Sequence, residues 1–101
     1  MCTFGYIRVN IRALKDGMTL ETINEPVEVI TYFDKKQMRP LRFRWRDRAY
    51  RIAAVNGVWY DQRGRTRIYH FHVATRESGS FELIYNTDDL LWKIGRICLD
   101  D

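Results

Sequence analysis

The chain lacks any long hydrophobic run, and this absence limits the classes of protein to which it can belong. Its apolar stretches are all far shorter than the roughly 20 residues that a membrane-spanning helix requires. The first ten residues, MCTFGYIRVN, contain neither an apolar signal core nor a small-residue cleavage site. We therefore expect a cytoplasmic protein with no membrane partner.

Cysteine and proline are also scarce, with two residues of each among 101. Cys2 and Cys98 lie at opposite ends of the chain and form no C-x-x-C motif. We expect two free thiols in a reducing compartment, with Cys98 packed as a small core residue in its apolar run. Pro26 and Pro40 are each expected to open a strand, where the missing N–H is tolerated.

Aromatic and β-branched residues, in contrast, are abundant, and they favour strands. The hydrophobic fraction of 46% and the aromatic fraction of 14% argue against disorder. A chain of this length can build one core but not two. We predict a single β domain over residues 1–101, in which residues 1–25 form an N-terminal strand and connection and residues 26–101 form the core.

Alternation of apolar and polar residues with a period of two recurs along the chain and predicts about seven strands. The predicted strands cover residues 6–12, 27–33, 41–46, 49–60, 65–74, 81–86 and 90–99. A kink or bulge is expected at Asn56-Gly57, and the ambiguous segment before residue 26 includes one helical turn as an option. No segment has the long helical period of a βαβ crossover. The sequence thus predicts an all-β antiparallel meander that forms a small barrel or a strongly bent sheet.

Positive charge is concentrated in the middle of the chain. Residues 35–67 contain eleven of the 17 basic residues and two of the 13 acidic residues, which gives this segment a net charge of +9 and leaves the rest at −5. Such segregation focuses an electrostatic field on an anionic partner. It also suits the association of two copies of the chain, in which the basic segment of one meets the acidic part of the other.

Residues 39–52, RPLRFRWRDRAYRI, contain six arginines in fourteen positions, yet large apolar residues alternate with them. If Asp47-Arg48 forms a two-residue turn, Arg44 lies opposite Arg51 in the resulting hairpin. The predicted inner face contains Phe43, Trp45, Tyr50 and Ile52. The predicted outer face contains Arg42, Arg44, Arg46 and Arg51. Because like charges directly across a strand pair cost stability, Arg44 and Arg51 require a carboxylate or an anionic ligand nearby.

The same region carries a family resemblance. Residues 39–100 contain five characteristic segments: FRWRDRAYRIAAV, VWYD, RIYHFHVAT, FELIYN and LLWKIGRICLD. They resemble a family of small uncharacterised bacterial β domains with a W-R-G-R-x-Y-x-V pattern, some of which are similar to domains found beside DNA-repair proteins of the Y-family polymerase type. The matching positions are Trp45, Tyr50, Trp59, Trp92 and Asp100. Asp47 replaces the family's glycine, and aspartate tolerates a positive φ better than most residues. The resemblance implies a β fold and a nucleic-acid context, but no reaction.

The two histidines are weak candidates for a metal site. His70 and His72 are two apart on one predicted strand, so their rings lie on the same side and supply two possible ligands. A third ligand would have to come from a neighbour such as Glu82. The alternative is that both imidazoles lie on a solvated face while the intervening residues point inward. Those inward-pointing residues are Tyr69, Phe71 and Val73.

No motif in the sequence indicates an enzyme or a cofactor. The carboxylate pairs Asp88-Asp89 and Asp100-Asp101 lie in a turn sequence and at the chain end. The segment RESGSF is typical of a hairpin turn rather than a nucleophile elbow, and the scattered glycines form no phosphate-binding loop.

The strongest functional signal is the set of arginines, since guanidinium groups bind phosphates and stack on bases. One hypothesis is a non-catalytic module that binds nucleic acid or another polyanion. Its candidate residues are Arg42, Arg44, Arg46, Arg48, Arg51, Arg63 and Arg65. Trp59 and Tyr60 point in opposite directions, so one of them is expected to be an exposed aromatic contact. The alternative is a protein-interaction or structural module, such as a homodimer that pairs through the strand at residues 6–12.

Overall fold

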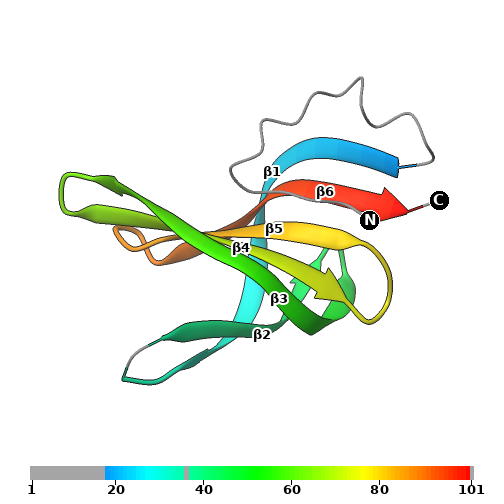
Figure 1. Ribbon diagram of the computed structural model, residues 1–101, viewed down its shortest axis with the longest axis horizontal. Helices are drawn as coiled ribbons and strands as arrows, with labels where there is room; N and C mark the ends of the chain where they lie inside the picture. The colour runs from blue at the N-terminus through cyan, green and yellow to red at the C-terminus, as the bar shows by residue number, and fades with distance from the viewer. Residues whose placement is uncertain (1–17, 36, 101) are drawn as a thin grey trace.

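The protein is a closed antiparallel β-barrel, seen in a computed structural model that describes residues 18–35 and 37–100 (Figure 1). Each strand pairs with the next along the chain, and β6 closes the barrel against β1. The strands of this part of the chain are β1 (Met18–Phe33), β2 (Met38–Trp45), β3 (Arg48–Arg63), β4 (Thr66–Thr75), β5 (Ser80–Asn86) and β6 (Leu91–Asp100). The predicted all-β antiparallel fold is confirmed. The strand predicted over residues 6–12 lies outside the described residues.

Two strands, β1 and β3, are long enough to take part in both halves of the barrel. Each has 16 residues; β1 pairs with β6 and then with β2, and β3 pairs with β2 and then with β4. A register shift between Val55 and Gly57 confirms the bulge predicted at Asn56-Gly57. Residues 18–25 belong to β1 and form no helical turn, and a φ of 59° at Asn24 accompanies another register shift there.

Both prolines lie inside strands, so the prediction that each opens a strand is wrong. Pro26 pairs with Lys93 of β6, and Pro40 pairs with Thr31 of β1. A register shift in β1 accompanies each of them, just before Pro26 and at Thr31. Bulges leave some backbone N–H positions of a ladder unpaired, so the missing donor of proline is tolerated at these sites.

The β2–β3 hairpin has the predicted inner and outer faces, but its turn comes one residue earlier than predicted. Arg46 and Asp47 occupy the turn with φ values of 52° and 62°, as a type I′ turn requires. Arg51 therefore lies opposite Arg42 rather than Arg44. Each cross-strand partner changes by two residues, an even number, so every side chain keeps its predicted face.

Aromatic rings from the inner face of this hairpin form one end of the core. Phe43, Trp45 and Tyr50 are all buried, and the ring of Phe43 stacks on that of Tyr50 at 5.0 Å. Both rings also contact Phe81 of β5. Such ring pairs contribute about 0.5–1.5 kcal/mol each beyond their buried area.

Cys98 is buried in β6 and is disulfide-bonded, so the prediction of a free thiol at this position is wrong. Cys2 lies outside the described residues. The described part of the chain also contains no helix with the length and apolar character needed to cross a membrane.

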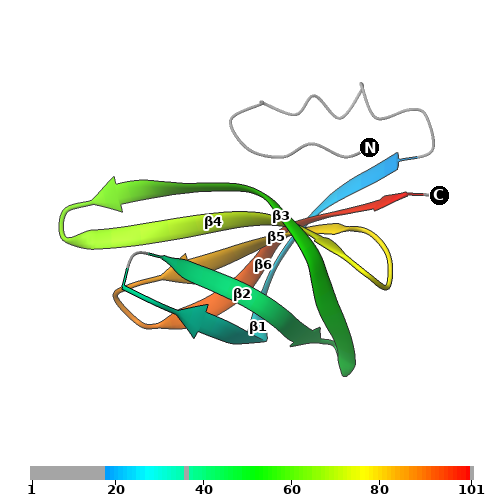
Figure 2. The ribbon, with the colours of Figure 1, turned by 60° about the horizontal axis from the view of Figure 1, so that its bottom comes forward.

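The turns gather at two ends of the molecule (Figures 1 and 2). The β2–β3 and β4–β5 turns lie at one end, and the β1–β2, β3–β4 and β5–β6 turns lie at the other. Because β3 runs the whole length between these ends, the arginines near its start and those near its end belong to different regions of the surface.

Candidate functional site

The outer face of the β2–β3 hairpin carries three exposed arginines side by side, which we call the arginine face: Arg42, Arg44 and Arg51. Arg42 and Arg51 are direct cross-strand partners. A shallow pocket of about 270 Å³ lies beside them, lined in part by Ile30, Arg42, Arg44 and Ala49. The small side chain of Ala49, opposite Arg44, leaves this part of the face open.

Carboxylates already pair with two arginines of this face, one from the β4–β5 turn and one from the turn of the hairpin itself. Glu77 accepts hydrogen bonds from the backbone N–H of Arg51 at 2.8 Å and from its Nε at 3.0 Å, and Asp47 accepts one from Arg44 at 3.2 Å. The backbone hydrogen bond from Arg51, followed by that from its side chain, lowers the pKa of Glu77 despite some desolvation. The arginine side chains in these two pairs remain 62–64% exposed.

The turn arginine Arg46 is held by a third carboxylate. Its Nε and Nη2 donate to Glu25 at 3.1 and 2.6 Å, and the indole Nε1 of Trp45 donates to the same carboxylate at 2.9 Å. The hydrogen bonds from Arg46 and then from Trp45 lower the pKa of Glu25. The guanidinium also lies over the Trp45 ring, 4.4 Å from its centroid.

Arg42 and Arg48 form no ion pair with any described residue. Arg42 lies on the arginine face, whereas Arg48 lies opposite Trp45, on the side of the hairpin that faces the core, with its guanidinium 5.4 Å from the centre of the Tyr50 ring. Arg42 is therefore the cation of the arginine face that is most available to an anion.

Arg63 and Arg65 lie elsewhere, on either side of Gly64 in the β3–β4 turn at the far end of β3 (Figure 1). Gly64 has a φ of 63°, which suits a glycine. The structure thus divides the seven predicted arginines into a group at the β2–β3 hairpin and a pair at the β3–β4 turn. The two groups do not line one groove.

Trp59 and Tyr60, near that turn, point in opposite directions, as predicted for adjacent residues of a strand. Tyr60 is 50% exposed, and the guanidinium of Arg67 lies 4.7 Å from its ring centre. Trp59 points to the other side and stacks on the imidazole of His70, with 5.2 Å between ring centres and 6° between ring planes. Tyr60 is therefore the exposed member of the pair.

His70 belongs to a charged ladder that crosses four strands. Its Nε2 lies 3.2 Å from Asp61 of β3, and its Nδ1 lies 3.2 Å from Glu82 of β5. Glu82 also accepts two hydrogen bonds from Arg96 of β6, at 3.0 and 3.1 Å. Burial raises the pKa of Glu82, but the hydrogen bonds from His70 and Arg96 outweigh that effect and lower it.

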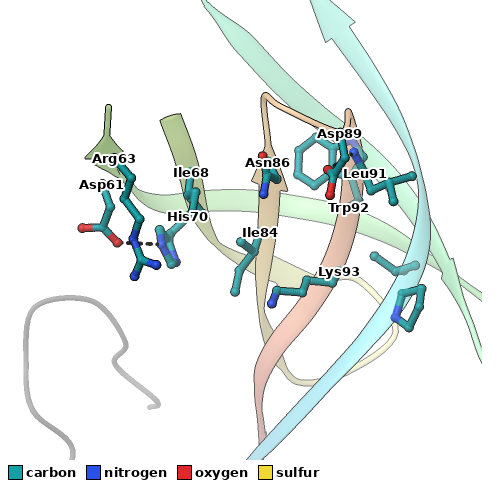
Figure 3. A pocket seen from close by; sticks show the side chains of 12 residues that line it. Asp61, Arg63, Ile68, His70, Ile84, Asn86, Asp89, Leu91, Trp92 and Lys93 are labelled. Carbon is teal, nitrogen blue, oxygen red and sulfur yellow. Dashed lines mark hydrogen bonds and ion pairs between the residues drawn. The ribbon is translucent and has the colours of Figure 1, made fainter. Parts of the chain in front are cut away.

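The geometry of this ladder suits a structural role. Both ring nitrogens of His70 face carboxylate oxygens, which only accept hydrogen bonds. The ladder ties β3, β4, β5 and β6 together beside a surface pocket of about 470 Å³. Figure 3 shows Asp61, Arg63 and His70 on one side of this pocket and Asp89, Leu91 and Trp92 on the other, with Ile84 and Asn86 between them.

His72 lies on the same face as His70, as the H-x-H spacing predicts, and is paired with Glu82 across β4 and β5. It is only 7% exposed, so the alternative in which both imidazoles are solvated does not describe it. Desolvation lowers its pKa. Among the described residues, no group of three His, Cys, Asp or Glu side chains is arranged to hold a metal ion.

The structure also contains a cleft that the sequence did not predict. It lies at the open end of the barrel, and we call it the barrel-mouth cleft. Its volume is about 590 Å³. It is lined by Phe33, Asp34, Gln37, Met38, Val58, Tyr69, Phe71, Tyr85, Thr87 and Leu90. Sequence alternation places Tyr69 and Phe71 on the inner face of β4. Alternation does not reveal that the barrel stays open beside these two residues, because the opening depends on how far β2 and β3 diverge.

The fold and these surfaces define a small antiparallel β-barrel domain with exposed arginines on its hairpins. Residues 18–90 match the family described as a domain of unknown function (DUF6504), and the chain belongs to this family. No curated protein and no solved structure matches it.

Proposed function

We propose that the protein is a non-catalytic binding domain whose arginine face binds nucleic acid or another polyanion. The observation that carries this proposal is the direct cross-strand pairing of Arg42 with Arg51. Glu77 neutralises Arg51, but Arg42 forms no ion pair with a described residue. Since like charges in this position are destabilising, an anion bound beside Arg42 would relieve the repulsion.

The existing ion pairs on this face do not prevent such binding. Exposed ion pairs contribute only about 0–1 kcal/mol, because water and salt screen them. A phosphate offers the guanidinium of Arg44 or Arg51 the same forked hydrogen bonds as a carboxylate does. Contacts of this kind carry little sequence information, so we expect affinity for many sequences. Some members of the family that the sequence resembles are similar to domains found beside DNA-repair proteins of the Y-family polymerase type, and this favours the same class of ligand.

A salt titration tests this function. Binding of a fluorescent oligonucleotide, followed by anisotropy, is expected to weaken steeply as salt rises. R42Q should weaken binding several-fold at low salt and reduce the salt slope by about one. Because the substitution also removes like-charge repulsion, it should leave the stability unchanged or raise it.

The control is K93Q, which removes one exposed cation from β6, outside the β2–β3 hairpin, and should weaken binding less than R42Q does. Absence of binding at the lowest salt concentration would reject the proposal. An equal loss of binding in R42Q and K93Q would reject the arginine face as its location.

A second candidate function is the interaction of this face with an acidic protein surface or another copy of the chain. The observation that favours it is an exposed apolar group beside the arginines, formed by Ile30, Tyr32 and Leu41. Sedimentation would detect a dimer, and a dimer that L41S disperses would support this candidate. A monomer at all concentrations would exclude self-association.

A further inference from the structure

Several large apolar side chains that line the barrel-mouth cleft are exposed instead of packed in the core. Phe33, Val58 and Leu90 line it from three different hairpins and are 60%, 54% and 67% exposed. The buried ring of Phe71 also lines it, and the half-buried rings of Tyr69 and Tyr85 complete its aromatic surface. Contiguous apolar surface of this kind marks a binding site on a soluble protein.

Flat rings dominate this surface. The ring centres of Tyr60 and Tyr69 lie 5.6 Å apart on neighbouring strands, and those of Tyr69 and Phe71 lie 6.4 Å apart along β4. Tyr60 contacts the cleft-lining residue Tyr69 without lining the cleft itself, and it is 50% exposed. A row of rings that ends in an exposed tyrosine resembles the surfaces on which single-stranded bases stack in a sequence-tolerant manner.

A cation lies at the edge of the row of rings. Arg67 extends over Tyr60 and donates from Nη1 to the phenol oxygen of Tyr69 at 3.3 Å, which fixes a guanidinium beside the cleft. Arg65 follows in the adjoining turn, whereas Arg63 lines the pocket on the other face of the β3–β4 hairpin. The cleft is therefore mainly apolar inside, with a cation fixed beside its Tyr69 wall.

This distribution of charge distinguishes among possible occupants. A second copy docked by the same surface would bring Arg67 close to its own symmetry mate, and like charges oppose that arrangement. Duplex nucleic acid keeps its bases paired and would have to unstack them first. Unpaired nucleotides offer both the ring faces and the phosphates that this site would bind.

We propose that the barrel-mouth cleft binds the unpaired bases of single-stranded nucleic acid, with Tyr60 as a stacking residue and Arg67 as a phosphate contact. This inference rests on the proposed function, because it specifies which polyanion is bound and how its bases are held. It assigns the cleft to the bases and leaves the arginine face to the backbone.

The decisive comparison uses two probes of equal length and charge, an oligothymidylate of about twelve nucleotides and its abasic counterpart. Stacking predicts that the oligothymidylate binds roughly tenfold more tightly than the abasic strand, and more tightly than a duplex of the same length. Y60L should lose most of this difference, whereas Y60F keeps the ring and should retain it. Both substitutions affect an exposed side chain, so folding should be preserved.

The outcomes separate this inference from the proposed function. Equal, salt-sensitive binding of the two probes would overturn the base-binding cleft while leaving polyanion binding intact. Failure of both probes to bind at low salt would overturn both proposals. A dimer in sedimentation that L90S disperses, together with equal binding of the two probes, would assign the cleft to a second copy of the chain instead.

Discussion

At the scale of single residues, Gly95 shows how closely the charged ladder is packed. A Cβ atom on Gly95 would lie 2.5 Å from Oε1 of Glu82 and 2.6 Å from Cδ1 of Ile84. Glu82 cannot move aside without breaking its hydrogen bonds to His70 and Arg96. The carboxylate of Glu82 in β5 can therefore be buried at this place only because residue 95 of β6 has no side chain.

We expect G95A to destabilise the protein by about 1–3 kcal/mol, the usual cost of overpacking a core. Urea denaturation followed by tryptophan fluorescence measures this change. G57A is the matched control, because a Cβ there would meet only ordinary contacts at 3.8 Å from His72 and Trp59. The explanation fails if G95A unfolds at the same urea concentration as G57A.

Two buried groups, His72 and Glu82, also predict how stability depends on pH. The pKa of His72 is lowered below its ordinary value of 6.5, so the unfolded chain binds a proton at this position more readily than the folded one. Stability from this residue is therefore present above pH 6.5 and lost as pH falls through the folded pKa. The pKa of Glu82 is lowered below 4.5, so its contribution is lost at still lower pH.

We expect the unfolding free energy to fall between about pH 7 and pH 5, and H72Q to flatten that part of the curve. The charged groups near His72 are Glu82, which favours its protonation, and Arg96, which opposes it. Urea titrations at several pH values provide the measurement. A curve for H72Q parallel to that of the original protein in this range would show that another group titrates there.

At the scale of the strands, period-two alternation predicted which side chains face the core, but not which residues lie opposite one another. Phe43, Trp45 and Tyr50 are buried as predicted, although the turn is one residue away. Facing is preserved because it depends only on whether the shift is even or odd. The exact register depends on Arg46 and Asp47, which adopt positive φ values in the turn. The alternation of apolar and polar residues carries no information about these φ values.

The partners of the candidate site residues come from other strands and were not predictable for that reason. Glu25 and Glu77 are far from the arginine hairpin in the sequence, yet they hold Arg46 and Arg51. Their placement requires the order of strands around the barrel. His70 illustrates the intermediate case, since Glu82 was named as a possible neighbour, but Asp61 and Arg96 were not.

At the scale of the whole molecule, the two groups of arginines lie too far apart to act as one patch. The molecule measures 40 Å along its longest axis, and β3 separates the β2–β3 hairpin from the β3–β4 turn (Figures 1 and 2). Salt screens charges over about 10 Å at 0.1 M ionic strength. A ligand therefore joins the two groups only if it is long enough to reach both.

This separation leads to two expectations. The two groups should contribute independently to the binding free energy, and only a long ligand should gain from both. For a long single strand, the fold losses caused by R42Q and by R63Q/R65Q should multiply in the combined variant, because distant sites act additively in free energy. A strand of about four nucleotides contacts one group at a time, so the advantage of having both should disappear. Anisotropy titrations with a series of strand lengths measure both effects. If the combined variant binds the long strand no more weakly than R63Q/R65Q alone, the arginine face contributes nothing and the ligand is held at the β3–β4 end of the barrel.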